Sequence, residues 1–242
     1  KAFALKGGSI ALLDFDPASL EKFTKEMKQD NARVFKHLCD VSKKRDCDEA
    51  IKAVIKHWGR IDILINNAGI TQRGSFLHTD VKVFKKVMDV NFYGSLYCTK
   101  AALPEIIDSK GAIVIIESVA GVTPLPGRTG YCASKHALHG MFATLRTELK
   151  NSGVHVMNVC PGFIKTNLQR RALGTDGSIA KTPRSTVGKD ATPQMVAEKV
   201  LKGLAKHKSI LAMTPAGKLA YFLNRISPSL FEWVIEKQIS KE

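Results

Sequence analysis

The sequence predicts an α/β fold in which helices cover both faces of a doubly wound parallel sheet. Three observations predict it. Apolar runs of strand length alternate with helical patterns along nearly the whole chain. These runs are almost continuously apolar, as in strands that are buried on both faces. The length of 242 residues suits one domain, residues 1–242, with a sizeable core. Such alternation is typical of strand–helix–strand units.

The first elements carry their own start and stop signals. A strand is expected at 9–14, and the helix after it begins near Pro17, a residue suited to a first helical turn, with Asp16 as its cap. A second strand within 32–40 leads into a helix that Ser42 could cap and Gly59 could close.

The remaining elements follow in the same alternation. Asn91 is a polar residue within a long helical pattern, where it is expected to bend or interrupt the regular bonding. The expected elements are a strand at 61–69, a helix at 81–107, a strand at 111–118, a helix at 129–150, a strand at 154–162 and a short strand at 209–213.

Composition narrows the class of protein. Hydrophobic content is 44% and charged content 24%, which is ordinary for a globular chain, and no apolar run is long enough for a transmembrane helix. The start is not a signal peptide. Five scattered cysteines favour free, mostly buried thiols and an intracellular setting, cytoplasmic or peripheral on a membrane. No metal site is expected.

The net charge of +15 is unusual. No nucleic-acid motif accompanies it, so no nucleic-acid partner is expected. A solvated basic surface, an anionic ligand and a membrane surface stay open as explanations.

The chemistry is concentrated between residues 118 and 135. Tyr131 and Lys135 are four apart on a predicted helix, so both leave one face. A nearby ammonium lowers the pKa of a tyrosine, which would suit general acid/base work. Ser118 ends a strand at the edge where open α/β sheets bind ligands. Each signal alone has a simpler interpretation: a surface pair, a turn serine and, for Asn91, a helix kink.

Together these residues match a family. NNAG at 66–69, Asn91, Ser118, YCASK at 131–135 and PGFIKT at 161–166 have the order and spacing of the short-chain dehydrogenase/reductase (SDR) family. The chain resembles this family to about Met213. The resemblance implies a Rossmann-like, three-layer α/β/α fold and the NAD(P)-dependent interconversion of a secondary alcohol and a ketone.

The resemblance also implies catalytic roles. Tyr131 would exchange a proton with the substrate oxygen, which Ser118 would hydrogen-bond. Lys135 would hold the nicotinamide ribose and lower the pKa of Tyr131, and Asn91 would keep a water in the proton relay through Lys135. Hydride would pass between the nicotinamide and the substrate carbon.

Cofactor binding is implied along the whole sheet edge. Gly69 would let backbone approach the cofactor closely. The implied contacts are Asp14, Asp40 and Val41 near the adenosine, Asn67, Ala68 and Gly69 near the ribose, Tyr131 and Lys135, and Pro161, Gly162, Ile164 and Thr166 near the nicotinamide.

Asp14 indicates which of the two nicotinamide cofactors, NAD or NADP, is preferred. An acid at the end of this strand can accept both ribose hydroxyls and repel a 2′-phosphate. The next residue is Phe15, where NADP-preferring relatives often carry arginine. NAD is therefore favoured and NADP stays an alternative, as does a plain capping role for Asp14 in the helix near Pro17.

The front of the chain departs from the family pattern. In the family a first strand and a Gly-rich turn resembling TGxxxGxG come before the first helix and cradle the pyrophosphate. Residues 1–8, KAFALKGG, resemble the later part of that helix. We therefore expect a truncated form of a longer enzyme, with two unpaired strand edges and weak dinucleotide binding. A natural short variant without catalysis is the alternative.

The C-terminal extension, residues 214–242, combines apolar and basic residues. It resembles the extension of SDR members that act on lipids or steroids, which implies peripheral membrane contact. The alternative is a helical pair that packs on its own domain or on a partner subunit. Its apolar groups are Leu219, Phe222 and Leu223, then Leu230, Phe231, Val234 and Ile235, with Pro228 between them.

Substrate specificity is assigned to the loop 167–193. Apolar residues near the predicted site indicate a hydrophobic or lipid-like substrate: Val119, Val122, Leu125 and Phe163. The family implies a homo-oligomer, a dimer or tetramer, to which Met141 and Phe142 could contribute unless they are core. The alternative functions are a non-catalytic binding or membrane-associated protein, and a lyase or epimerase on the same fold.

Overall fold

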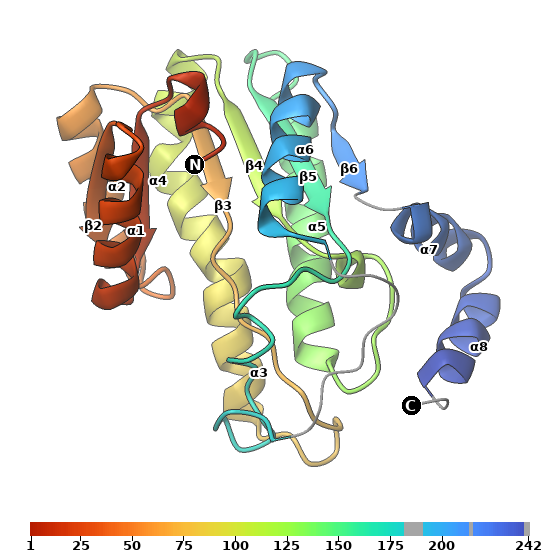
Figure 1. The fold of residues 1–242 in the computed structure, drawn as a ribbon. Coiled ribbons are helices and arrows are strands. Elements are labelled where there is room, and N and C mark those ends of the chain that lie inside the picture. The colour runs from red at the N-terminus through yellow and green to blue at the C-terminus, as the bar shows by residue number, and fades with distance from the viewer. Residues whose placement is uncertain (182–190, 213–214, 240–242) are drawn as a thin grey trace.

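The computed structural model describes residues 1–181, 191–212 and 215–239, and it confirms the α/β prediction (Figure 1). The strands are β1 (Ile10–Asp14), β2 (Val34–Leu38), β3 (Ile63–Asn66), β4 (Ala112–Ile116), β5 (His155–Cys160) and β6 (Ile210–Ala212). The helices are α1 (Pro17–Gln29), α2 (Lys44–Trp58), α3 (Val81–Met88), α4 (Gly94–Asp108), α5 (Thr129–Glu148), α6 (Pro193–Ala205), α7 (Pro215–Ile226) and α8 (Pro228–Ile239). Helix α6 had not been expected from the sequence.

Among the described residues, the six strands pair in parallel and form two sheets. β1 pairs with β2, and the second sheet has the order β3-β4-β5-β6. β1 and β3 are not hydrogen-bonded to each other, and both line the same cavity. The expectation of two unpaired strand edges is therefore confirmed for the described residues.

The core lies on both faces of the second sheet, because side chains alternate along each strand. On one face, Ile113 and Ile115 of β4 pack with residues of α2, α4 and α5. On the other face, Val114 packs with residues of β5, β6 and α6. Figure 1 shows α6 on the opposite side of the sheet from α4 and α5. Phe142 is fully buried and Met141 packs against the first cluster, so both belong to the core.

Helix ends mostly follow the sequence signals. Asp16 caps α1 by accepting a hydrogen bond from the Ala18 amide at 3.1 Å, and Pro17 opens the helix. Asp14 does not cap this helix, since its Oδ1 accepts from the Asp16 amide at 3.0 Å. Gly59 closes α2 with a φ of 75°, a left-handed conformation that favours glycine.

The expected cap at Ser42 is wrong. The cap of α2 is Lys43, which makes no side-chain capping hydrogen bond. The Ser42 hydroxyl donates to Asp40 Oδ1 at 2.7 Å, so it is not available to the helix.

Asn91 interrupts its helix as the sequence predicted. The expected helix at 81–107 consists of α3, a π-helical turn η2 (Asp89–Tyr93) and α4. A π turn is a common way to place a functional side chain within a helix.

The N-terminal segment differs from the expected helix, whereas the C-terminal extension agrees with the expected helical pair. The segment expected as the later part of a helix contains a 3₁₀ turn, η1 (Ala4–Lys6), closed by Gly7 at a φ of 84°. The extension forms the expected pair of helices, separated at Pro228. Among the described residues, no helix has the length and apolar character needed to span a membrane. Within the loop 167–193, residues 182–190 lie outside the described part of the chain.

Candidate active site

One cavity of about 2010 Å³ lies along the carboxyl ends of the strands and continues between β1 and β3. The sequence-predicted residues that line it are Asp14, Asp40, Val41, Asn67, Ala68, Gly69, Ser118, Tyr131, Lys135, Pro161, Gly162, Ile164 and Thr166. Asn91 is the predicted residue that does not line it, because its side chain is buried behind the cavity wall. The fold thus brings residues from separate segments to one edge of the sheet.

Tyr131 and Ser118 both line the cavity. Ser118 follows β4 and caps a short 3₁₀ turn, η3 (Val119–Gly121), where its Oγ accepts from the Ala120 amide at 3.1 Å. Tyr131 lies in the first turn of α5 and is 8% exposed. Burial raises the pKa of Tyr131, while the hydrogen bond with Ser118 and the charge of Arg128 lower it in part.

The expected lowering of the Tyr131 pKa by Lys135 is therefore wrong for this structure. The Lys135 ammonium donates to the Ile116 carbonyl at 2.9 Å and lies 5.8 Å from the centroid of the Tyr131 ring. Burial dominates the pKa of Tyr131 instead, and it favours the neutral phenol.

Lys135 lies in a buried position, which disfavours the charged form of its ammonium. Lys135 is 4% exposed, and burial lowers the pKa of the ammonium to about 8. The negative charge of Glu117 opposes this lowering. Lys135 therefore loses its proton at a much lower pH than an ordinary lysine.

The Asn91 side chain acts as a structural clamp. Its Oδ1 accepts from the Ile70 amide at 2.8 Å, and its Nδ2 donates to the Ile70 carbonyl and to Ser134 Oγ at 3.0 and 2.8 Å. These bonds tie the strand end after β3 to helix α5. The expected hold on a water by Asn91 stays a prediction.

Gly69 lies where backbone passes close to this clamp. A Cβ at Gly69 would be 3.3 Å from Asn91 Oδ1 and 3.7 Å from Lys135 Nζ. Because Asn91 is held by three hydrogen bonds, it has little freedom to make room for a larger residue.

Sequence reasoning missed a buried polar cluster beneath Tyr131. Gln72 is 1% exposed, and its Oε1 accepts from the Tyr131 amide at 2.9 Å. Arg128 donates to Thr71 Oγ1 at 2.9 Å and to Gln169 Oε1 at 3.0 Å. Arg128 lies three residues before Tyr131 in the printed sequence, but no spacing rule connects it to Thr71 or Gln169.

Comparisons with known proteins agree with this fold. The family model described as short chain dehydrogenase matches residues 1–176, well over half of the chain. The chain belongs to the short-chain dehydrogenase family.

Curated relatives support the same family. This short-chain dehydrogenase is 35% identical over 248 residues to a dehydrogenase/reductase SDR family protein 7-like of Anopheles gambiae, covering 99% of the chain and 78% of the relative. It is 35% identical over 249 residues to dehydrogenase/reductase SDR family member 7B of Xenopus laevis, covering 100% and 77%.

Solved structures share the fold. A short-chain dehydrogenase/reductase from Burkholderia phymatum in complex with NAD gives a TM-score of 0.83 at 23% identity, covering 95% of this chain and 89% of that chain. An alcohol dehydrogenase from Thermococcus sibiricus complexed with 5-hydroxy-NADP gives 0.72 at 25% identity, covering 87% and 86%.

The end of β1 in this dehydrogenase carries both signs of charge. Asp14 lines the cavity there, and Phe15 is 65% exposed. Arg171, from the loop after β5, also lines the cavity, and its NH2 lies 3.9 Å from Asp16. Sequence reasoning did not place this arginine near the strand end.

The opposite end of the cavity is apolar, and the C-terminal extension helps to form it. Asn224 of α7 donates to the Val122 carbonyl at 2.8 Å, which ties the extension to the turn after Ser118. The apolar lining there consists of Val119, Leu125, Phe163, Leu219, Leu223, Phe231 and Val234. Val122 itself does not line the cavity, although its carbonyl anchors α7.

Proposed function

We propose that this short-chain dehydrogenase interconverts a secondary alcohol and a ketone on a hydrophobic or lipid-like substrate, with Tyr131 as the general acid/base. The convergence of Ser118, Tyr131 and Lys135 on one cavity carries the proposal. Two hydroxyls placed together can hydrogen-bond a single substrate oxygen, and the protonated Tyr131 can give its proton to that oxygen.

The protonation states of the site favour this role. Because burial raises the pKa of Tyr131, the phenol is neutral near pH 7 and serves as the acid in ketone reduction. The Ser118 hydroxyl lowers the pKa of Tyr131 in part, against the effect of burial. In the reverse direction Tyr131 has to lose its own proton first, and the tyrosinate then accepts the alcohol proton, which the raised pKa of Tyr131 makes more favourable at high pH.

The cavity lining includes the residues that the family resemblance assigns to a nicotinamide dinucleotide. The relatives include a structure with NAD and one with 5-hydroxy-NADP. Asp14 would hold the adenosine ribose, Gly69 offers a backbone surface without a side chain, and Lys135 would hold the second ribose. When bound, the cofactor supplies or accepts the hydride.

Cofactor preference is proposed to lie with NAD. The Asp14 carboxylate would accept the ribose hydroxyls and repel a 2′-phosphate. The nearby Arg171 would instead favour NADP, because its guanidinium could pair with the 2′-phosphate.

Tyr131→Phe tests the catalytic role. We expect kcat/KM to fall by about 1000-fold because the proton donor is lost, within the range found for general acids. Binding of NADH, measured by calorimetry, is expected to change little. Tyr93→Phe, at a half-exposed tyrosine outside the cavity, is the matched control. Turnover that survives in Tyr131→Phe would remove this residue from the mechanism, and NADH binding without any turnover in the wild type would favour the non-catalytic alternative.

Asp14→Asn tests the cofactor preference. We expect the wild type to bind NADH more tightly than NADPH, and the variant to lose roughly 10-fold of that preference because the repulsive charge is gone, an effect of about 1.4 kcal/mol. Calorimetric titration with both dinucleotides measures the ratio. Equal affinity of the wild type for the two would contradict the assignment of NAD.

Chain length of the substrate tests the apolar wall. In a series of secondary alcohols we expect kcat/KM to rise by about 3- to 4-fold for each added methylene, which corresponds to burial of about 0.8 kcal/mol. Leu125→Ser should flatten this dependence more than it changes kcat. A series with no length dependence would refute the hydrophobic-substrate proposal while leaving the alcohol–ketone chemistry intact.

The oligomeric state of the chain, a dimer or tetramer, stays a prediction, to be checked by light scattering.

A further inference from the structure

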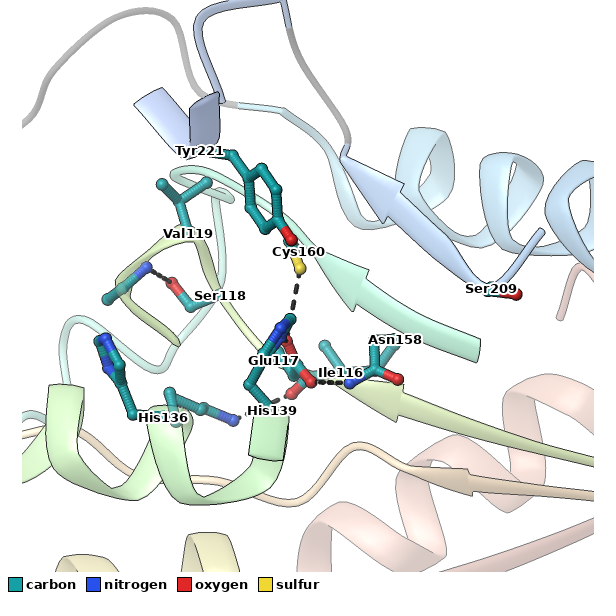
Figure 2. A network of polar contacts seen from close by, with 12 residues as sticks. Ile116, Glu117, Ser118, Val119, His136, His139, Asn158, Cys160, Ser209 and Tyr221 are labelled. Atoms are coloured by element: carbon teal, nitrogen blue, oxygen red, sulfur yellow. Dashed lines mark hydrogen bonds and ion pairs between the residues drawn. The ribbon is translucent and has the colours of Figure 1, made fainter. Parts of the chain in front are cut away.

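A buried polar cluster of Glu117, His139 and Cys160 lies beside the candidate active site (Figure 2). Glu117 follows β4, His139 is one turn beyond Lys135 on α5, and Cys160 ends β5. The mechanism above uses none of the three side chains. Their ligand atoms all lie within 4.8 Å of one another.

The distances within the cluster approach those of a metal coordination sphere. Glu117 Oε2 is 3.1 Å from His139 Nδ1 and 3.3 Å from Cys160 Sγ. Bond lengths of about 2.0 Å for Zn–O and Zn–N and about 2.3 Å for Zn–S give tetrahedral edges of about 3.3 and 3.5 Å. These two edges are therefore short by only a few tenths of an ångström, and the third, between the ligand atoms of His139 and Cys160, is at most 4.8 Å.

The donor set matches a borderline cation. One thiolate, one imidazole and one carboxylate are ligands that Zn²⁺ accepts together, and three protein ligands leave the fourth position for water. A divalent cation, a thiolate and a carboxylate sum to zero charge. That balance suits a site in which the Glu117 side chain is fully buried.

Outer contacts hold the carboxylate as a ligand. Asn158 Nδ2 donates to Glu117 Oε1, which leaves Oε2 to face His139 and Cys160. Arg146 in turn donates to Asn158 Oδ1 and, through Nε, to the Val156 carbonyl at 2.9 Å. Such supporting contacts commonly orient the ligands of metal sites.

An entry route exists on the side of His139. Its side chain is 20% exposed, whereas Glu117 is covered. Tyr221 of α7 lies over this side, with its ring centroid 6.4 Å from that of His139 (Figure 2). The C-terminal extension thus covers the cluster without sealing it.

We propose that Glu117, His139 and Cys160 bind a divalent cation of the zinc class. On binding, Cys160 releases its thiol proton to solvent and forms a metal–sulfur bond. His139 donates the lone pair of Nδ1 to the metal, and its imidazole proton is then on Nε2. Neither the metal nor any ligand is oxidised or reduced. The site differs from the sequence expectation of no metal, because its ligands come from elements 22 and 43 residues apart.

Cobalt provides a direct test. The full chain is freed of metal with a chelator under reducing conditions and titrated with Co²⁺. We expect one equivalent to give the visible absorption of tetrahedral cobalt together with a thiolate-to-cobalt charge-transfer band in the near ultraviolet. Added Zn²⁺ should remove both bands by competition.

Variants decide which residues bind. Cys160→Ser should abolish the charge-transfer band, and His139→Gln should weaken cobalt binding by at least about 10-fold. Cys132→Ser and His136→Gln are matched controls on the same helix, outside the cluster, and should keep both bands. Far-ultraviolet circular dichroism establishes that each variant is folded.

The following outcomes of the cobalt titration would overturn the metal-binding proposal. Absence of both bands in the wild type shows that the cluster is a hydrogen-bonded network only. Bands that persist in Cys160→Ser, or disappear in Cys132→Ser, place the metal elsewhere. The readout is independent of turnover, so failure of the alcohol–ketone proposal would leave it unaffected.

Discussion

At the scale of single residues, the environment of a side chain decides its chemistry more than its neighbours in sequence do. The spacing of Tyr131 and Lys135 suggested that the lysine charge would set the pKa of the tyrosine. In the structure the ammonium is bonded to the Ile116 carbonyl, and burial sets the direction for both groups. Burial raises the pKa of the tyrosine and lowers that of the lysine, because it disfavours the charged form of each.

The pH dependence of ketone reduction follows from these directions. Below its pKa of about 8 the Lys135 ammonium is charged and can hold the cofactor ribose, while above it this charge is lost. Tyr131 stays protonated over the same range because its pKa is raised. We expect kcat/KM for reduction to be level near pH 6 to 7 and to fall by roughly 10-fold per pH unit well above pH 8.

Initial rates between pH 6 and 9.5 with NADH as the varied substrate measure this profile. NADH affinity, determined at the same pH values, should weaken in parallel. A rate that stays level beyond pH 9 would mean that the charge of Lys135 is not needed or that its pKa is ordinary.

At the scale of elements, the π turn at Asp89–Tyr93 connects packing to the active site. The turn places the Asn91 side chain inside the protein, where it binds both backbone groups of Ile70 and the hydroxyl of Ser134. A regular helix with an apolar residue at this position would leave these buried groups without those partners. The clamp therefore fixes Ile70, directly after residues 67–69, which are proposed to contact the cofactor.

Asn91→Ala should destabilise the protein strongly. We expect the free energy of unfolding to fall by about 3 kcal/mol, because several buried polar groups lose their partners. Urea denaturation followed by circular dichroism measures the loss, with an unchanged m value showing that the effect lies in stability. Asn151→Ala, at an exposed turn residue, should change it by no more than about 0.5 kcal/mol. Similar values for the two variants would show that the clamp contributes little.

At the scale of the whole molecule, the C-terminal extension has two faces. Asn224 attaches α7 to the domain, and Phe231 of α8 is 4% exposed. Figure 1 shows the pair at the margin of the fold, beyond β6. The apolar residues left exposed are Leu219, Phe222, Ile226, Leu230 and Trp233. The extension therefore packs in part on its own domain, as the alternative interpretation expected. Peripheral membrane contact stays a prediction.

Vesicle co-sedimentation tests that contact. An apolar face with basic residues beside it favours an anionic bilayer, so the wild type should pellet with anionic vesicles more than with neutral ones. Paired Phe222→Asp and Ile226→Asp substitutions should reduce pelleting by at least about 10-fold, since they add negative charge to the exposed apolar face proposed to contact the bilayer. Leu77→Asp, at an 83% exposed leucine outside the extension, is the matched control. Equal pelleting of all three proteins would contradict membrane contact through this face.

Much of the fold was determined by local signals in the sequence. Apolar runs that alternate with helical patterns predicted the six strands of the described residues, and the residues that end these strands fall on one edge because parallel strands share a direction. Asp16, Pro17 and Gly59 act within one helical turn, so their roles could be predicted correctly. Thirteen of the predicted site residues line one cavity, because most of them lie at or after the carboxyl ends of parallel strands.

Only the tertiary structure decided the features that depend on long-range contacts. The capping role of Ser42 failed because Asp40 binds its hydroxyl. The pKa of Tyr131 depends on burial by segments distant in sequence, and Arg128 meets Gln169 only through folding. The Glu117, His139 and Cys160 cluster forms where two strand ends meet a helix, and no sequence spacing encodes it. Periodicity and end signals are local, whereas burial, charge balance and coordination depend on which elements the packed chain brings together.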